Sequence, residues 1–78
     1  MPKYFFDSGA GEVYLEDDIG LECEGFDDAI RAALEGLADL VKENVKDPID
    51  RQVIIQIRDA NGERLAALTL FLEIARIK

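Results

Sequence analysis

The stretch from Phe26 to Lys46 is the one long part of this chain in which apolar residues recur at helical spacing. Pro48 cannot continue a helix, so the pattern predicts a single amphipathic helix over residues 26–46. A lone helix with one apolar side needs a sheet to pack on, and this requirement constrains the whole fold. The expected apolar stripe consists of Phe26, Ile30, Ala33, Leu34, Leu37, Leu40 and Val41, and the polar side of Arg31, Glu35, Asp39, Lys42 and Lys46.

Two details of this helix have more than one explanation in the sequence. Either Gly25 or Asp27 can serve as the N-cap. Gly36 lies in the middle of the helix, where glycine costs about 1 kcal/mol relative to alanine. It is explained either by simple tolerance or by a site where another backbone approaches closely.

The other segments alternate in the manner of strands, which are predicted over 3–7, 12–16, 49–58 and 65–77. The first strand holds three successive aromatic rings and is therefore expected in the centre of the sheet. A turn is predicted over 8–11 and a tight hairpin connection, containing Asn-Gly, over 59–63. The order β-β-α-β-β predicts one α+β domain over residues 1–78. It has a four-stranded antiparallel sheet, strand order 2-1-3-4, with one helix packed on one face.

The connection from Glu16 to Asp28 contains seven carboxylates and no basic residue. Its spacing does not match a calcium-binding loop, so a solvated connection is favoured over a divalent-metal loop. The neighbouring acids disfavour a thiolate at Cys23, which is expected to be a small buried hydrophobic residue.

Residues for catalysis are scarce in this chain. It has no histidine and a single cysteine, which excludes a histidine-dependent triad and a structural zinc set. Asp7, after the aromatic strand, is the least implausible acid–base residue, but a role in capping a turn explains it better. We therefore expect no catalytic residue, no cofactor, no metal site and no enzymatic activity.

Charge is unevenly distributed along the chain, whose formal net charge is -8. Residues 1–50 hold fourteen acidic and four basic side chains, a net of -10, and residues 51–78 hold three acidic and five basic, a net of +2. Such acidity disfavours nucleic-acid binding and suits a basic protein partner. The absence of a long apolar run, of a signal-peptide pattern and of paired cysteines predicts a cytoplasmic protein without a membrane segment.

Four segments follow one another along nearly the full chain. They are Met1-Pro2-Lys3-Tyr4-Phe5-Phe6-Asp7, then Asp17-Asp18-Ile19-Gly20, then the helix residues Ala29, Ala32, Ala33, Leu34, Leu37 and Ala38, and finally Ile57-Arg58-Asp59-Ala60-Asn61-Gly62. In their order and spacing the chain resembles a family of small uncharacterised proteins common in soil alphaproteobacteria, a domain of unknown function. The family usually has Leu-Pro-Asp before the helix, where Cys23-Glu24-Gly25-Phe26-Asp27 stands here. The resemblance implies no catalytic residues.

The turn into the helix, Cys23-Glu24-Gly25-Phe26-Asp27-Asp28-Ala29, carries a second, weaker resemblance. There the chain is similar to the partial RNase-H-like domain of HicB-type antitoxins, which neutralise a small basic toxin. This resemblance implies an acidic protein that binds a basic partner.

The last predicted strand indicates self-association. If the hairpin connection is 59–63, Arg58 opposes Arg64 and Arg51 opposes Phe71, so residues 74–77 have no partner within the hairpin. An edge strand that is apolar on both faces needs to be paired or covered. The sheet face away from the helix adds further apolar residues, and we expect a twofold homodimer. The predicted interface consists of Phe5, Tyr14, Ile54, Phe71, Ile74 and Ile77.

The sequence therefore predicts a non-catalytic protein-binding or regulatory module that self-associates. Two other functions remain open: an antitoxin-like neutraliser of a small basic partner, and a metal-dependent module that uses the acidic residues 16–28.

Overall fold

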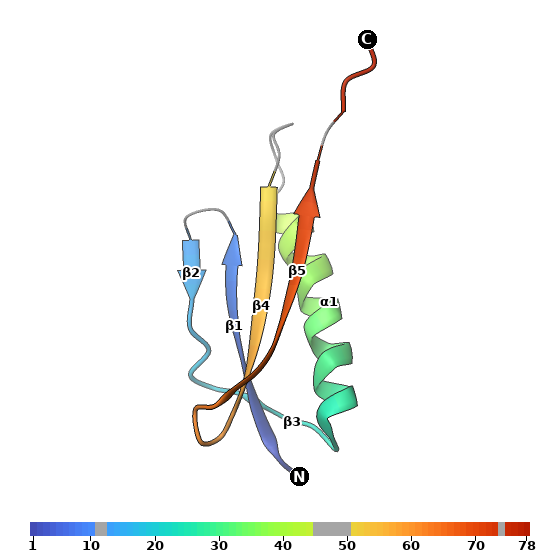
Figure 1. Cartoon of the computed structure of the whole chain (residues 1–78). Coiled ribbons are helices and arrows are strands. Elements are labelled where there is room, and N and C mark those ends of the chain that lie inside the picture. Colours follow the sequence, from blue (N-terminus) through green and yellow to red (C-terminus); the bar gives the residue numbers. More distant parts are fainter. Residues whose placement is uncertain (11–12, 45–50, 74) are drawn as a thin grey trace.

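The structure is a computed structural model that describes residues 1–10, 13–44, 51–73 and 75–78. One helix packs against an antiparallel sheet, so the predicted α+β fold is confirmed (Figure 1). The sheet has a fifth, two-residue strand that the sequence did not predict. The elements are β1 (Lys3–Ala10), β2 (Val13–Leu15), β3 (Leu21–Glu22), α1 (Phe26–Asn44), β4 (Arg51–Asp59) and β5 (Arg64–Leu72).

The strands lie in the order β2-β1-β4-β5, as predicted, and β3 pairs with the beginning of β1. The central position expected for the aromatic strand is therefore confirmed. The turn expected over residues 8–11 is wrong in its first three residues. Ser8, Gly9 and Ala10 continue β1 and pair on one side with β2 and on the other with β4. Gly11 lies outside the described residues.

The hairpin of β4 and β5 contains a β-bulge. Arg58 pairs with Arg64, as the connection predicts, but Ile57 pairs with Ala66, so that Leu65 is the extra residue. The predicted pairing of Arg51 with Phe71 is therefore wrong, and Arg51 pairs with Leu72.

The bulge follows from the apolar pattern of the two strands. Directly opposite residues of an antiparallel pair point to the same face of the sheet. Without the bulge, Leu68 would lie opposite Ile54 and face away from the helix. With it, Leu68 lies opposite Ile55 on the face that packs against α1.

Helix α1 packs mainly across β4 and lies less extensively on β1 and β5. The buried residues of α1 are Ala29, Ala33 and Leu37, which belong to the core that α1 forms with the sheet. Leu34 was expected on the apolar stripe, but it is 55% exposed, because the contact line runs through residues four apart, 29, 33 and 37. The core consists of Tyr4, Ala10, Cys23, Ala29, Ala33, Leu37, Val53, Ile55 and Ile57.

The ends of the predicted elements change slightly. The helix begins at Phe26, and its first backbone bond runs from the Ala29 N–H to the Gly25 carbonyl, which makes Gly25 the N-cap. It is described to Asn44, so residues 45–46 of the predicted helix and 49–50 of the predicted third strand lie outside the described residues. Strand β5 ends at Leu72 rather than at residue 77, and the described residues after it run away from the sheet (Figure 1). Within the described ranges, α1 is too polar to be a membrane-crossing helix.

Candidate functional site

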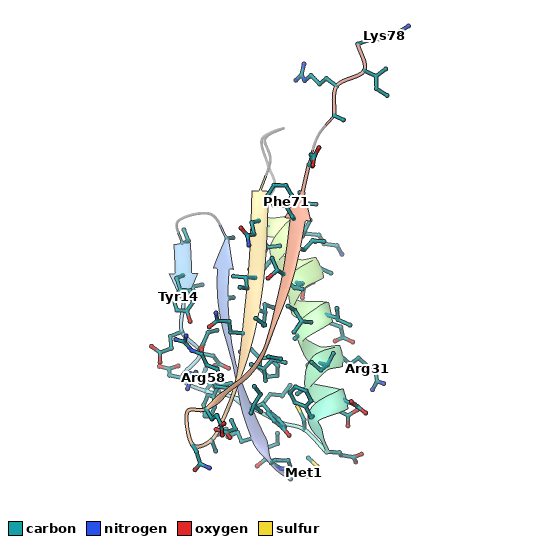
Figure 2. The ribbon with its side chains drawn as sticks, viewed as in Figure 1. Met1, Tyr14, Arg31, Arg58, Phe71 and Lys78 are labelled. Carbon is teal, nitrogen blue, oxygen red and sulfur yellow. The ribbon has the colours of Figure 1, made fainter. Side chains whose placement is uncertain are left out.

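The sheet has one face against α1 and one face turned away from it, which we call the outer face. Strand pairing assigns residues to this face. Phe5 lies opposite Arg58, Gly9 lies opposite both Tyr14 and Ile54, and Phe71 lies opposite Gln52. Alternation along the strands then places Phe5, Tyr14, Ile54 and Phe71 together on the outer face, as the sequence predicts. Figure 2 shows Tyr14 and Phe71 on the two strands at opposite edges of the sheet.

The upper part of the outer face is apolar and exposed. Phe71 is 60% exposed and Tyr14 is 53% exposed. Gly9 lies between these two residues and has no side chain, and side chains from both neighbouring strands lie close to it. A Cβ built on Gly9 would lie 3.2 Å from Ile54 Cγ2 and 3.5 Å from Tyr14 Cδ2. The glycine therefore lets an aliphatic and an aromatic side chain approach each other over the centre of the sheet.

The charges on the outer face are unusual for a chain with a net charge of -8. In β1, β2, β4 and β5, alternation places a single carboxylate on this face, that of Asp7, and its residue is only 2% exposed. The cationic residues Lys3, Arg58 and Arg64 lie on the same face. The four longer strands therefore present apolar, neutral polar and cationic groups outward.

Asp7 is held by Arg58 from the adjacent strand. Arg58 Nε donates to Asp7 Oδ2 at 2.6 Å, and Arg58 Nη2 donates to Asp7 Oδ1 at 3.1 Å. Both residues lie on the outer face, and Arg58 lies opposite Phe5, two residues before Asp7. Asp7 is thus a residue in the middle of β1 that forms a buried two-point ion pair, and the expected role in capping a turn is wrong.

Asp17 joins the acidic loop, residues 16–20, to this ion pair. Its backbone N–H donates to Asp7 Oδ1 at 2.9 Å, and its carbonyl accepts a hydrogen bond from Arg58 Nη2 at 2.8 Å. Its carboxylate accepts three backbone N–H groups, those of Phe6 at 3.0 Å, Ile19 at 3.0 Å and Gly20 at 3.1 Å. The acidic connection is therefore not solvated throughout, because Asp17 is a structural acceptor.

The Phe6 N–H explains why an acid is needed at this point. β2 pairs with β1 over Ser8–Ala10, and β3 pairs with it over Lys3–Tyr4. Between these two short strands the Asp17 carboxylate takes the place of a strand carbonyl. A buried backbone donor without such a partner would destabilise the fold.

The acidic loop lies on the lower part of the outer face, over Phe5. A Cβ built on Gly20 would be 2.9 Å from both Lys3 Cε and Phe5 Cε2, and Gly20 has a φ of 79°. The Phe5 ring also lies 5.0 Å from Arg58 Cζ and 5.9 Å from Lys3 Nζ, measured to the ring centroid. These cation–π contacts hold the ring between two positive groups beneath the loop.

The pKa values of the cluster follow from these contacts. The hydrogen bonds from Arg58 lower the pKa of Asp7, against burial, which raises it. For Asp17, burial raises the pKa, but the N–H donors of Gly20, Phe6 and Ile19 together outweigh it and lower the pKa below its ordinary value. Pairing with Asp7 raises the pKa of Arg58. All three groups are therefore charged near neutral pH, and none is adjusted for proton transfer.

Comparison with known protein families gives a match over residues 3–71 to a family described as Domain of unknown function (DUF6894). The chain belongs to the DUF6894 family. The predicted membership in a domain-of-unknown-function family is confirmed. The DUF6894 match runs from the beginning of β1 almost to the end of β5 and so includes the whole Asp7–Asp17–Arg58 cluster. Neither curated proteins nor solved structures gave a match.

The other two residues of the predicted interface are Ile74 and Ile77. Ile74 lies outside the described residues, and Ile77 is 92% exposed in the segment that runs away from the sheet. Sequence reasoning missed Arg58 and Asp17 as members of the cluster. One signal for Arg58 was available: Asp7 is two positions after Phe5 and shares its face, so a cation directly opposite Phe5 lies on that face near Asp7.

Among the described residues, no three histidine, cysteine or acidic side chains lie close enough together to form a metal site. Cys23 is buried, as predicted, and its thiol lies 3.8 Å from the Leu21 carbonyl.

Proposed function

We propose that this DUF6894 domain is a non-catalytic protein-binding or regulatory module that self-associates as a twofold homodimer. The observation that supports it best is the exposed aromatic part of the outer face, formed by Phe71 and Tyr14 beside Ile54. Apolar surface of this kind is stabilised when a partner removes it from water. The neighbouring residues supply no metal set and no adjusted acid–base pair, so binding is the function that the surface favours.

Charge favours a second copy as the partner on this side of the molecule. Two copies with a net charge of -8 repel each other through most of their surfaces. On the outer face the four longer strands add no exposed carboxylate to this repulsion, because the carboxylate of Asp7 is buried and paired there. Two copies can therefore approach through the β4 and β5 part of this face without bringing exposed strand carboxylates together.

Light scattering and sedimentation at micromolar concentration test this proposal. We expect the unmodified chain to have twice the mass of one chain, and Phe71→Glu to have the mass of one. The matched control is Leu34→Glu, which places the same charge at another exposed apolar residue, 55% exposed on α1. A monomeric unmodified chain, or equal effects of the two substitutions, would contradict the proposal.

A basic protein is a second candidate partner, as in the antitoxin-like function. The solvent side of α1 supports it, because Glu35, Asp39 and Glu43 are exposed there and Asp27 and Asp28 lie in its first turn. We expect affinity capture to retain a small basic protein on the unmodified chain and on Phe71→Glu, but not on Glu35→Lys/Asp39→Lys. If Glu35→Lys/Asp39→Lys retains the same basic protein as the unmodified chain, this function is excluded.

A metal-dependent function is tested by thermal unfolding with calcium, magnesium or manganese. A site that binds only the folded chain must raise the Tm. We expect no change in Tm, and a rise that disappears in Asp17→Asn or Asp18→Asn would establish a site in the acidic loop. Cytoplasmic location belongs to the same proposal and is supported by a single, buried, unpaired cysteine.

A further inference from the structure

The two edges of the sheet differ in how open they are to another strand. On the first edge, β2 has three residues and β3 has two, and the Asp17 carboxylate occupies the gap between them. Short strands and nearby acids are the usual protection of a sheet edge against pairing with another chain. This edge is therefore closed.

The second edge is β5, nine residues long and last in the strand order. Among the described residues, no strand lies beyond it. From Leu65 to Leu72 it contains no charge and no proline, and its bulge lies at Leu65, next to the hairpin. Leu65 is 40% exposed and Leu70 is 39% exposed. The backbone from residue 66 to 72 is thus an unprotected edge.

We infer that β5 pairs antiparallel with β5 of a second copy, so that two sheets become one continuous sheet. This inference rests on the proposed self-association and specifies its geometry. A twofold axis perpendicular to the sheet maps β5 onto itself in the opposite direction, which is the pairing that an antiparallel ladder needs. Opposite residues then share a face, so both copies of α1 lie on the same side.

Charge agrees with this arrangement. The axis passes through the part of the chain from residue 51 to 78, which has a net charge of +2, whereas residues 1–50 have a net charge of -10. Pairing at β5 therefore keeps the acidic parts of the two copies away from the contact. Pairing at β2 would instead bring together two loops that contain Glu16, Asp17 and Asp18.

Stacking of two whole outer faces is less favourable than pairing of edges. The acidic loop stands on the lower part of the outer face over Phe5, and it is held there by Asp17 and Gly20. Two flat faces cannot approach to the spacing of about 10 Å that packed sheets need while these loops stand between them. Pairing at β5 leaves the acidic loops where they are. It brings the Phe71 side chains of both copies close to the boundary between the two sheets.

Hydrogen exchange of backbone amides distinguishes the two geometries on the unmodified chain. In a single copy, every second amide of β5 points away from β4 and exchanges quickly. When about nine-tenths of the chains are paired, those amides should exchange about tenfold more slowly, because only the unpaired tenth exposes them. A dimer in which these alternate amides stay fast would overturn the inference but keep the proposed self-association. A chain that stays monomeric would overturn both.

A charged residue on β5 gives a second measurement. Leu70→Lys places a charge on the edge strand, and we expect it to abolish the dimer. Leu34→Lys adds the same charge on α1 and should leave the dimer unchanged. Circular dichroism checks that both variants fold. A folded Leu70→Lys variant that remains dimeric would contradict edge pairing, and the exchange measurement stays decisive if that variant unfolds.

Discussion

Gly36 of α1 lies directly against Ile55 of β4: a Cβ built on the glycine would be 2.9 Å from Ile55 Cδ1. Carbon atoms in contact are normally separated by about 3.5–4.0 Å. Glycine in mid-helix is therefore explained by a close approach, and the neighbour is a side chain of the sheet rather than another backbone. The small residues Ala29 and Ala33 allow the same closeness along the helix, and both are almost completely buried.

This contact predicts an interaction between two substitutions. Gly36→Ala gains about 1 kcal/mol of helix propensity but overpacks the core, which costs about 1–3 kcal/mol, so we expect a net loss of stability. Ile55→Val removes Cδ1 and alone should cost about 0.5–1.5 kcal/mol. In that background Gly36→Ala should become stabilising. Urea unfolding of all four chains measures the difference, and an unchanged effect of Gly36→Ala would show that the contact is unimportant.

Because Leu37 is buried and Leu34 is exposed, the same substitution at these two residues of α1 should lower the free energy of unfolding by different amounts. Leu37→Ala removes a side chain from the core and should cost about 2–5 kcal/mol. Leu34→Ala, at a residue 55% exposed, should cost well under half as much. Glu35→Ala, on the polar side, should change the free energy of unfolding by less than about 0.5 kcal/mol. Equal losses at Leu34 and Leu37 in urea unfolding would mean that the sheet lies on a different side of the helix.

Much of the fold could be predicted from the sequence because the signals are local. Helical spacing from Phe26, the Asn-Gly connection and strand alternation together predict the helix, the hairpin and the strand order. The bulge was predictable in principle. The α1-facing residues of β4 have odd numbers (53, 55 and 57), whereas their apolar partners on β5 (66, 68 and 70) have even numbers. A register that pairs Arg58 with Arg64 joins only odd with odd and even with even, so one extra residue is required.

The cluster around Asp7 could not be predicted in the same way. Asp17 is one of seven acids in its segment, and nothing in the sequence distinguishes it from Asp18. The difference arises from the gap between β2 and β3, where the Phe6 N–H needs an acceptor. That gap depends on where two very short strands end, which weak local preferences do not determine.

Asp17 and Asp18 therefore form a matched pair for a stability test. Asp17→Ala removes the acceptor of three backbone N–H groups, and leaving such donors without a partner should cost about 1–3 kcal/mol. Asp18 is exposed, and Asp18→Ala should lie within about 0.5 kcal/mol of the unmodified chain. Both substitutions remove one negative charge, so their difference in chemical unfolding isolates the hydrogen bonds. Equal effects would mean that the acidic loop contributes only through its charge.

A buried and an exposed ion pair among the described residues predict a second contrast. Asp7 pairs with Arg58 in a nearly buried position, whereas Asp28 pairs with Arg31 at 2.9 Å on the surface of α1, where their side chains are 41% and 71% exposed. Asp7→Ala leaves Arg58 Nε and the Asp17 N–H without their acceptor, and we expect it to cost about 3 kcal/mol. Asp28→Ala should cost less than about 1 kcal/mol. Similar unfolding free energies for the two variants would mean that the Asp7–Arg58 ion pair contributes no more to stability than the exposed pair on α1.

The last prediction concerns acid. The Arg58 hydrogen bonds lower the pKa of Asp7, and three N–H donors, outweighing burial, lower the pKa of Asp17. In the unfolded chain both carboxyls return to about 3.9. At pH values between the lowered folded pKa and the unfolded pKa, the unfolded chain binds more protons, so stability rises with pH there. The contribution of both groups is thus fully present above about pH 5 and is lost as pH falls through their folded pKa values.

Acid also changes the overall charge of the chain, whose formal net charge is -8 at pH 7, so a control for this change is needed. The variant Asp7→Asn/Asp17→Asn is that control, since it keeps the side-chain shape and all the other acids but removes these two carboxyls. We expect the unmodified chain to be more stable than this variant at pH 6, and the difference between them to shrink steadily as the pH is lowered toward 2.5. Urea unfolding at half-unit pH intervals measures it. A difference that stays constant over that range would mean that the two carboxyls do not titrate with the lowered pKa values that their contacts require.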